Sequence, residues 1–249
     1  MSIQETHCIS LSGITHSFNG AKPVDRAVEN ITFSVPEGEF FVLLAPSGCG
    51  KSTLLRIIAG LMKPSEGGLA FSPKERRDQI ALVFQGFGIF PWLTVSENVA
   101  FGLRMRGTPE QEIQRKVTQY LQELGLTDAA GYYPKQLSGG MKQRVGIARA
   151  LAVDPEILLL DEPFSQLDAF TAEKLRLDLL NLWKKEGFTI IMVTHLIEEA
   201  VILADRIAVM TSKPGRIEAI VENSLPRPRN DRDPDFWKIE DKLSDIVKY

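Results

Sequence analysis

Cysteine is scarce in this chain, where Cys8 and Cys49 are the only two. Two thiols this far apart in the sequence are too few for a disulfide framework or a thiolate zinc site, and they favour a reducing compartment, with the cytoplasm as the default. Long apolar runs are also missing, since none approaches the roughly 18 residues of a membrane-spanning helix. The N-terminus lacks the basic-then-apolar layout of a signal peptide. We therefore expect a protein that, if it works at a membrane, docks there.

The chain has no surplus of positive charge. Its 29 lysine and arginine residues face 32 acidic ones, for a net charge of −3. A phosphate polymer needs a basic surplus, so we expect no nucleic-acid partner. Hydrophobic residues make up 44% and charged residues 24% of the 249 residues, which is ordinary globular usage and excludes wholesale disorder. The length predicts one large domain or a domain with a subdomain.

Hydrophobic patterns divide the chain into strand-rich and helix-rich parts. Alternation through residues 31–35 and the Asn19-Gly20 turn signal predict antiparallel strands and hairpins over residues 9–40. Continuous apolar runs predict strands buried on both faces, and they lie at residues 40–45, 80–84, 157–160, 189–194 and 207–210. Between Gly86 and Asp154 helical periodicity predominates, notably over residues 110–124 and 141–152, which predicts a helical insertion. Towards the end, residues 225–233 are predicted to form an exposed linker, followed by a helix with Phe236, Ile239, Leu243 and Ile246 on one stripe.

A glycine-rich loop follows the apolar run that ends at Ala45. It consists of Ala45, Pro46, Ser47, Gly48, Cys49, Gly50, Lys51, Ser52 and Thr53, and a helical pattern comes directly after it. In this context backbone N–H groups and a helix N-terminus converge on phosphates, the lysine reaches the β/γ oxygens, and the Ser52 hydroxyl ligates magnesium. The alternative is a plain turn with a surface lysine. Phosphate loops usually begin with glycine, and we predict that Ala45 is tolerated because this position needs no positive φ.

A second glycine pair, Gly139-Gly140, follows Ser138 and precedes a helical pattern. Ser138 is placed to cap that helix, and its N-terminus would form a second anion site; the alternative is only a capped helix start. This segment, with the following Lys142-Gln143-Arg144, resembles the signature motif of ATP-binding cassette (ABC) ATPases. Its spacing to the strand ending in Asp161-Glu162-Pro163 fits that family, and the resemblance extends from Phe18 to about Met210. It implies an α/β fold: a RecA-like P-loop NTPase core, an N-terminal antiparallel β subdomain and an inserted α-helical subdomain.

The resemblance also implies roles for polar residues at strand ends. Successive residues of a strand face opposite ways, so Asp161 and Glu162 suit different tasks: Asp161 would hold Mg²⁺ through water, and Glu162 would be the general base. His195, after the strand at 189–194, would sense the γ-phosphate, and Gln85 would contact Mg²⁺ and the attacking water. Taken alone, these are a polar pair, a histidine and an amide at strand ends, where ligands bind in α/β proteins.

Three further segments carry less specific signals. Phe18 matches the aromatic residue that stacks on adenine in the family, with core filling as the alternative. The segment 165–168 resembles the loop that contacts the partner site across the dimer, although Gln166 replaces the usual alanine and Leu196 replaces the aspartate that commonly follows the histidine. Phe87, Phe90 and Trp92, after Gln85, are predicted either to pack between sheet and helices or to line a groove for a helix of a membrane subunit.

The resemblance predicts the ATP-hydrolysing subunit of a membrane importer, with ATP and Mg²⁺ held in a head-to-tail dimer of identical or closely related subunits. Its partners would be a transmembrane permease and, indirectly, a substrate-binding protein, and it would lie on the cytoplasmic face of the inner membrane. Segments around Val35, Pro91 and Leu225 resemble the group that imports nitrate, sulfonates, taurine or bicarbonate. A soluble ABC-type ATPase and a non-catalytic assembly subunit are the alternatives.

The predicted organisation is a single ABC ATPase domain. Residues 1–85 and 155–212 would form the nucleotide-binding core with its antiparallel part, residues 86–154 the helical subdomain, and residues 213–249 a C-terminal linker and helix. None of the site residues would contact the transported substrate, so the sequence does not name it.

Overall fold

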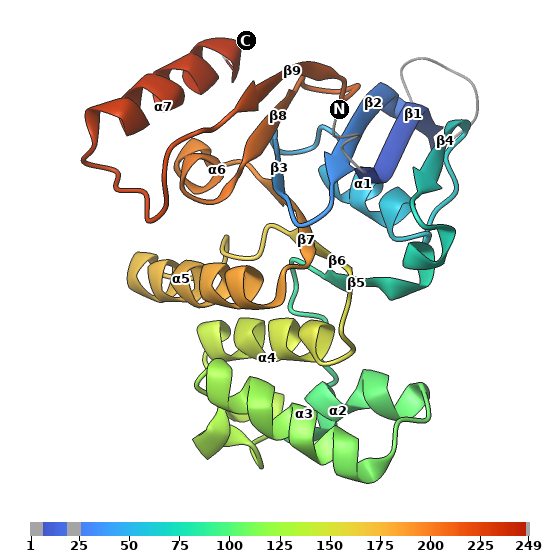
Figure 1. The fold of residues 1–249 in the computed structure, drawn as a ribbon, viewed down its shortest axis with the longest axis vertical. Helices are drawn as coiled ribbons and strands as arrows, with labels where there is room; N and C mark the ends of the chain where they lie inside the picture. The colour runs from blue at the N-terminus through green and yellow to red at the C-terminus, as the bar shows by residue number, and fades with distance from the viewer. Residues whose placement is uncertain (1–6, 19–25, 248–249) are drawn as a thin grey trace, which may run out of the picture. The chain divides into compact units, whose positions relative to one another are not determined.

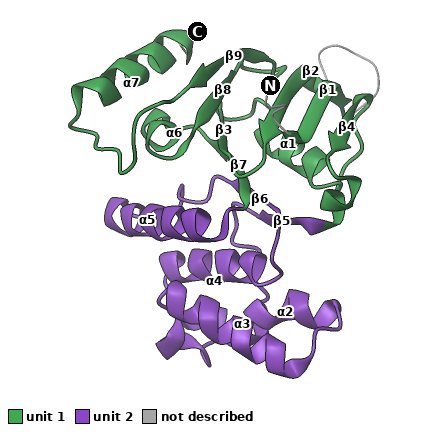
Figure 2. Ribbon diagram, in the orientation of Figure 1, with its two compact units in different colours: residues 1–78, 188–249 green, residues 79–187 purple. Residues whose placement is uncertain are grey.

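The computed structural model describes residues 7–18 and 26–247. These residues form two compact units, one of residues 1–78 and 188–249 and the other of residues 79–187 (Figure 2). The Asn19-Gly20 turn signal lies outside the described residues.

The first unit contains an antiparallel sheet in the order β2-β1-β4, made by β2 (Arg26–Pro36), β1 (His7–Ser17) and β4 (Glu66–Phe71) (Figure 1). The predicted antiparallel strands are confirmed, and Ile31, Phe33 and Val35 are buried as the alternation requires. The strand β4 was not predicted, because Glu66-Gly67-Gly68 gives it no hydrophobic alternation.

Four more strands of this unit lie in the order β7-β3-β8-β9. The parallel strands β7 (Thr189–Thr194), β3 (Phe40–Leu44) and β8 (Arg206–Met210) match predicted apolar runs and are buried almost throughout. The antiparallel edge strand β9 (Ile217–Glu222) was not predicted. The helices of this unit are α1 (Lys51–Ile58), α6 (Ile197–Leu203) and α7 (Pro234–Val247).

Residues 225–233 were predicted to form an exposed linker, and this exposure was wrong for the side chains of Arg227 and Arg229. Arg229 donates through Nη1 to the carbonyl oxygens of Val201 and Ala204, at 2.8 and 2.6 Å, and Arg227 pairs with Asp205 at 2.5 Å. Burial lowers the pKa of the Arg229 guanidinium to about 10, so it remains charged at neutral pH. The two side chains therefore bind the C-terminal end of α6, where carbonyl groups have no partner within the helix.

The second unit pairs two parallel strands, β5 (Ile80–Val83) and β6 (Ile157–Asp161). Its helices are α2 (Val95–Met105), α3 (Glu110–Glu123), α4 (Gly139–Leu151) and α5 (Ala169–Glu186). Short 3₁₀ turns lie at Lys74–Gln79 (η2, at the boundary of the units), Thr127–Ala129 (η3) and Pro134–Gln136 (η4). Helices α3 and α4 agree with the predicted helical segments to within two residues.

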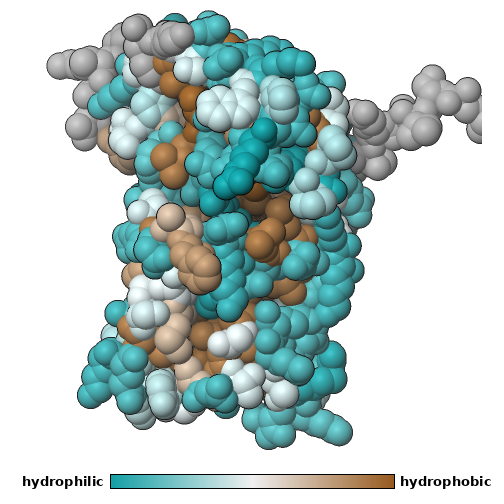
Figure 3. Space-filling view, turned by 90° about the vertical axis from the view of Figure 1, so that its left-hand side faces the viewer, coloured by the Kyte–Doolittle hydropathy of each residue, from teal (hydrophilic) through white to brown (hydrophobic). Residues whose placement is uncertain are grey.

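Helix α4 lies at the centre of the second unit, where it packs against α2, α3, α5 and β5. Two of these helices begin with side-chain caps: Thr94 and Glu97 form a capping box at α2, and Asp168 accepts a hydrogen bond from the Thr171 N–H at α5. In the part of the chain that the structure describes, we find no helix whose length and hydrophobicity would let it cross a membrane. The face drawn in Figure 3 is mostly hydrophilic, with hydrophobic residues visible between polar ones.

Candidate functional site

The predicted phosphate loop joins β3 to α1 in the first unit. Gly48 and Gly50 have φ values of 81° and 97°, a region that favours glycine, and Gly50 is the N-cap of α1. Ala45 is not among the residues with positive φ, which confirms that this position does not require glycine. The loop therefore has the two glycines its backbone needs, and it ends at a helix N-terminus, where backbone N–H groups and the helix dipole favour an anion.

Lys51 folds back across this loop. Its side chain is 5% exposed, and its Nζ donates to the carbonyl oxygens of Ala45 and Pro46, both at 2.9 Å. Carbonyl oxygens hold the ammonium group at the start of the loop without neutralising its charge. Lys51 is thus positioned to exchange these carbonyls for phosphate oxygens.

The first unit also places His195 next to the phosphate loop. Strands β3 and β7 run parallel with Leu44 opposite Thr194, and the Ala45 N–H donates to the Thr194 oxygen at 3.1 Å. His195 follows directly and is exposed. The Thr194 hydroxyl donates to buried Glu199 at 2.6 Å and accepts from the Leu196 N–H at 3.1 Å, so the turn carrying His195 is fixed from both sides.

Gln85 and Glu162 meet in the second unit. Strands β5 and β6 are parallel with Val83 opposite Leu160, so each residue lies two positions beyond a matched strand end. The Gln85 Nε2 donates to the Glu162 Oε2 at 3.2 Å. Glu162 has a φ of 45°, which is unusual for a residue with a side chain and costs about 1–2 kcal/mol. Such strain is typical of side chains held for function.

Asp161 differs from its neighbour as the sequence predicted. It ends β6 and is 6% exposed, whereas Glu162 is half-buried. The donors proposed for Mg²⁺, namely the Ser52 hydroxyl, the Asp161 carboxylate and the Gln85 amide oxygen, are hard oxygen ligands that suit this ion. Within the described residues, no group of three or more histidine, cysteine or acidic side chains offers a metal site built by protein ligands alone. The donor set thus fits an ion that takes most of its ligands from phosphate and water.

The second glycine pair begins α4 as predicted. The exposed Ser138 is the N-cap of α4, and its Oγ accepts a hydrogen bond from the Met141 N–H at 3.3 Å. A Cβ on Gly140 would lie 2.4 Å from the Thr171 Cγ2, so this position needs glycine to pack against α5, whereas a Cβ on Gly139 would meet little. Arg144 fastens the helix further by pairing with Asp178 of α5 at 2.5 Å and donating to the Leu124 carbonyl at 3.1 Å.

The exposure of Phe18 distinguishes between the two roles predicted for it. Phe18 is 58% exposed and meets the His16 ring edge-on at 5.0 Å, so the core-filling alternative is wrong and stacking on adenine stays a prediction. Gln166 and Leu196 are both exposed, and their effect on coupling also stays a prediction. Asp168 accepts the Thr171 N–H, and this hydrogen bond lowers the pKa of the Asp168 carboxyl.

The aromatic loop, defined as residues 86–94, has both packed and exposed aromatic side chains, and its role as a groove for a membrane subunit stays a prediction. Phe90 is half-buried against Phe101, with ring centroids 4.5 Å apart, and under Arg149, whose guanidinium lies 5.2 Å from the ring centre. Trp92 contacts the Phe90 ring but is 70% exposed. Phe87 has a φ of 64° and is half-buried. The loop thus has a packed base and an exposed tip.

Asn98 holds this loop, a role that was not predicted from the sequence. The side chain is completely buried in α2, and its Oδ1 accepts the Phe90 N–H at 2.8 Å. Its Nδ2 donates to the carbonyls of Phe90, Leu93 and Thr94 at 2.9–3.1 Å. An asparagine on the inner face of a helical pattern was the only available signal.

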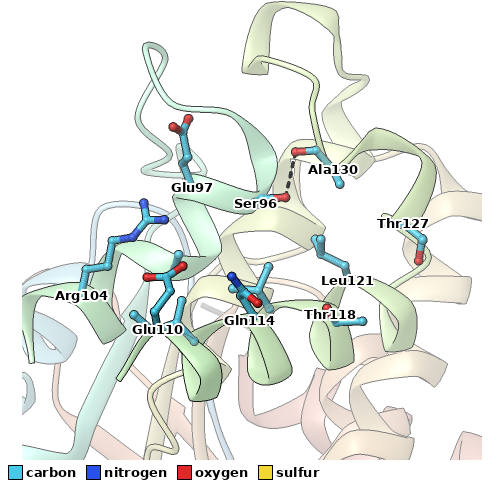
Figure 4. Close-up of a pocket in the computed structure, with 12 residues that line it drawn as sticks. Ser96, Glu97, Arg104, Glu110, Gln114, Thr118, Leu121, Thr127 and Ala130 are labelled. Carbon is cyan, nitrogen blue, oxygen red and sulfur yellow. Dashed lines mark hydrogen bonds between the residues drawn. The ribbon is translucent and has the colours of Figure 1, made fainter. Parts of the chain in front are cut away.

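Helices α2 and α3 also enclose a pocket of about 430 Å³ (Figure 4). Apolar side chains such as Ile113, Val117 and Leu121 form its floor on α3, and charged residues lie beside them. The Ser96 hydroxyl donates to the Ala130 oxygen at 3.0 Å, which ties α2 to the turn after η3. Residues of α2 line this pocket, and the aromatic loop leads directly into the N-terminus of α2.

Comparison with known proteins supports the predicted resemblance. Residues 28–165 match the ABC transporter family. An uncharacterized ABC transporter ATP-binding protein of Methanocaldococcus jannaschii is 47% identical over 234 residues, which cover 93% of this chain and 87% of that protein. An aliphatic sulfonates import ATP-binding protein of Bacillus cereus is 43% identical over 239 residues, 94% of each chain.

Solved structures of ABC transporter cassettes also resemble this chain. A dimeric bacterial ABC transporter cassette has a TM-score of 0.77 at 35% identity, covering 89% of this chain and 99% of its own. A dimeric post-hydrolysis cassette bound to ADP and Pi has a TM-score of 0.75 at 33% identity with the same coverage. The predicted α/β P-loop NTPase fold, with its antiparallel and helical parts, is confirmed. The chain belongs to the ATP-binding cassette transporter family, and it is an ATPase that binds ATP.

Proposed function

We propose that the residues predicted from the motifs perform the hydrolysis. The phosphate loop from Ala45 to Thr53 binds the phosphates of ATP, Phe18 stacks on adenine, and His195 senses the γ-phosphate. Glu162 accepts a proton from the attacking water, and Gln85 orients that water. The observation that carries this proposal is the 3.2 Å hydrogen bond between Gln85 and a Glu162 held at positive φ. A positioned general base typically contributes about 10²–10⁴ in rate.

Mg²⁺ belongs to the same proposal. Ser52 and Gln85 would ligate it directly and Asp161 through water, because their oxygen atoms suit this ion. When bound, it neutralises charge that develops on the phosphates. Ser138, Gly139 and Gly140 would bind the ATP held mainly by a second ATPase subunit, since a capped helix N-terminus favours an anion. Two equivalent sites in a head-to-tail dimer, of identical or closely related chains, would follow.

We further propose that the chain drives a membrane importer for a small anion such as an aliphatic sulfonate, nitrate, taurine or bicarbonate. Support comes from the 43% identity to an aliphatic sulfonates import protein over nearly the whole chain. A transmembrane permease subunit is the direct partner, and a substrate-binding protein is an indirect one. The chain would lie peripherally on the cytoplasmic face of the membrane. Its division would follow the motifs, with residues 1–85 and 155–212 as core, 86–154 as helical subdomain and 213–249 as C-terminal part.

The aromatic loop is our candidate for the contact with the permease. Trp92 and Met105 are each 70% exposed; tryptophan is among the side chains that carry much of the binding energy at interfaces, and methionine is enriched there. The loop begins right after Gln85, and a Cβ on Gly146 of α4 would lie 3.0 Å from the Phe87 oxygen. A helix of the permease that binds this loop would thus contact a segment that is joined directly to Gln85, the partner of Glu162, and that packs on α4.

Replacing Glu162 by glutamine tests the assignment. Glu162→Gln preserves size and a hydrogen-bonding oxygen but not the base, so ATP turnover should fall by about 10²–10⁴ while ATP still binds and the dimer accumulates. Turnover and sedimentation with ATP and Mg²⁺ measure both. Glu173→Gln, the same change at an exposed glutamate of α5, is the matched control. Wild-type turnover in Glu162→Gln would move the base elsewhere.

Two other functions make different predictions. A soluble ABC-type ATPase would purify without a permease, and a non-catalytic assembly subunit would not hydrolyse ATP in the purified transporter. Co-purification identifies the permease and substrate-binding protein, and uptake of sulfonate, nitrate, taurine and bicarbonate by the assembled transporter decides the substrate class.

A further inference from the structure

The Cys49-Gly50 peptide of the phosphate loop is closely confined by other parts of the first unit. A Cβ on Gly50 would lie 2.5 Å from the Ala27 oxygen and 2.7 Å from the Val28 Cγ1. Real Cβ atoms do not approach other atoms so closely, so β2 leaves this peptide no room to move in that direction.

Gly215 confines the same peptide. A Cβ on Gly215 would lie 2.2 Å from the Cys49 oxygen and 2.9 Å from the Met210 Cε. Gly215 is not among the residues with positive φ, so the backbone does not require glycine here. Glycine is required instead by the lack of space, because a side chain at this position would collide with the backbone of the phosphate loop.

Hydrogen bonds fix Gly215 in this place. Its N–H donates to the Ala27 oxygen at 3.0 Å, and its own oxygen accepts the Glu29 N–H at 2.9 Å. The Thr211 hydroxyl closes the turn by donating to the Pro214 oxygen and accepting the Arg216 N–H, both at 3.0 Å.

An ion pair adds to this attachment. The Arg216 Nε donates to the Glu29 carboxylate at 2.8 Å, which joins the turn at residues 211–216 to β2 by side chains as well as by backbone.

The sheet explains why this turn meets the phosphate loop. Strands β3 and β8 are parallel neighbours with Leu44 opposite Val209, so their carboxyl ends lie at the same edge. The phosphate loop follows β3, and the turn at residues 211–216 follows β8 and leads into β9. Nothing in the phosphate motif itself points to a residue more than 160 positions further along the chain.

We propose that the turn at residues 211–216 braces the phosphate loop and that Gly215 is a positioning residue for ATP binding. The inference rests on the proposed phosphate-binding role of the loop. Backbone N–H groups bind phosphate only when they point at it, and Cys49-Gly50 leads directly into Lys51 and Ser52. A displacement of about 1 Å can cost up to roughly 10²-fold in a positioned site. Gly215 contacts no nucleotide itself and acts through the Cys49 carbonyl.

Gly215→Ala tests the brace. We expect the affinity for Mg²⁺-ADP, measured by calorimetry, to fall about tenfold or more, with a matching rise in the KM for ATP and a smaller change in kcat. Gly68→Ala is the matched control, because Gly68 belongs to the same unit, has no positive φ and has nothing within 4 Å of a built Cβ. Affinity equal to that of Gly68→Ala would overturn the proposal.

A double-mutant cycle with Lys51→Ala separates positioning from general damage. If Gly215 acts through the phosphate loop, the fold-loss from Gly215→Ala should shrink in the Lys51→Ala background, since contacting groups couple and distant ones add. Equal fold-losses in both backgrounds would contradict the brace. Unchanged affinity in Lys51→Ala alone would instead contradict the proposed function of the loop.

A milder change covers the case in which Gly215→Ala does not fold, as judged by circular dichroism. Thr211→Val keeps the shape of the side chain but removes the hydroxyl that closes the turn. Its ADP affinity should fall severalfold and couple to Lys51→Ala in the same way. Wild-type affinity in a folded Thr211→Val protein would then overturn the proposal.

Discussion

Asn98→Ala should cause a large loss of stability in the second unit, because it removes a buried side chain that holds the aromatic loop. The wild-type amide makes four hydrogen bonds to the backbone of the aromatic loop while being completely buried. Alanine keeps α2 intact, because it has the higher helix propensity. The effect of the substitution is therefore confined to the loop that Asn98 holds.

The expected magnitude follows from these four bonds. A hydrogen bond within a protein contributes about 0.5–1.5 kcal/mol net, and a buried group left without a partner costs about 1–3 kcal/mol. The Phe90 N–H loses its Asn98 acceptor. Among the three carbonyls, that of Phe90 still accepts the Leu93 N–H and that of Thr94 still accepts the backbone N–H of residue 98. We expect the free energy of unfolding to fall by about 2–4 kcal/mol, or roughly 5–15 °C in Tm.

Urea unfolding followed by tryptophan fluorescence measures this change, with Trp92 on the loop as one of three reporters. Asn181→Ala is the matched control, because Asn181 is an exposed asparagine in α5 of the same unit, and its replacement should change stability by less than about 0.5 kcal/mol. A loss below about 1 kcal/mol in Asn98→Ala would refute the reasoning that these bonds hold the loop.

Three other changes have expected outcomes. Ala45→Gly should leave nucleotide affinity within a few fold, because the backbone there needs no positive φ; a tenfold gain on titration would show strain. Glu186→Gln should raise the urea midpoint near pH 8 but not near pH 4, since partial desolvation of the Glu186 carboxylate and the nearby Glu123 charge raise its pKa above the ordinary 4.5. Stability from this group is fully present below the unfolded pKa and is lost as pH rises through the folded pKa. Equal midpoints at both pH values would contradict this sign, and Gln still accepts the Tyr120 hydroxyl. Trp92→Ala should keep Tm and ATP binding near wild type while weakening permease pull-down, whereas Phe90→Ala should lower Tm as well; an unaffected pull-down in both would place the permease contact elsewhere.

Local motifs were sufficient to predict the phosphate loop, the capped signature helix and the different environments of Asp161 and Glu162. These features depend on residues that are adjacent in the chain: an apolar run, a glycine-rich loop with its lysine, and a cap before a helix. Apolar runs likewise predicted β3, β6, β7 and β8, because a strand buried on both faces needs continuous hydrophobicity. The run at residues 80–84 predicted β5 as well, but burial on both faces was wrong there, since only Ala81 and Val83 are buried and Phe84 is exposed. The family resemblance extended this to the fold.

Contacts between distant segments decided the rest. The strand β4 was missed because Glu66-Gly67-Gly68 gives it no hydrophobic alternation, and β9 was missed because glutamates interrupt it and only Val221 in it is buried, so it has no continuous apolar run. The sequence around Arg227 and Arg229 is typical of an exposed linker. In the structure, both side chains bind at the C-terminal end of α6, where backbone carbonyl groups lack partners within the helix. Glycine at position 215 and asparagine at position 98 are explained only by backbone atoms that the fold brings to them. A sequence thus states which groups a chain carries and which local structures they favour, whereas the space around each group, and the partners it must satisfy, exist only once the strands and helices have packed.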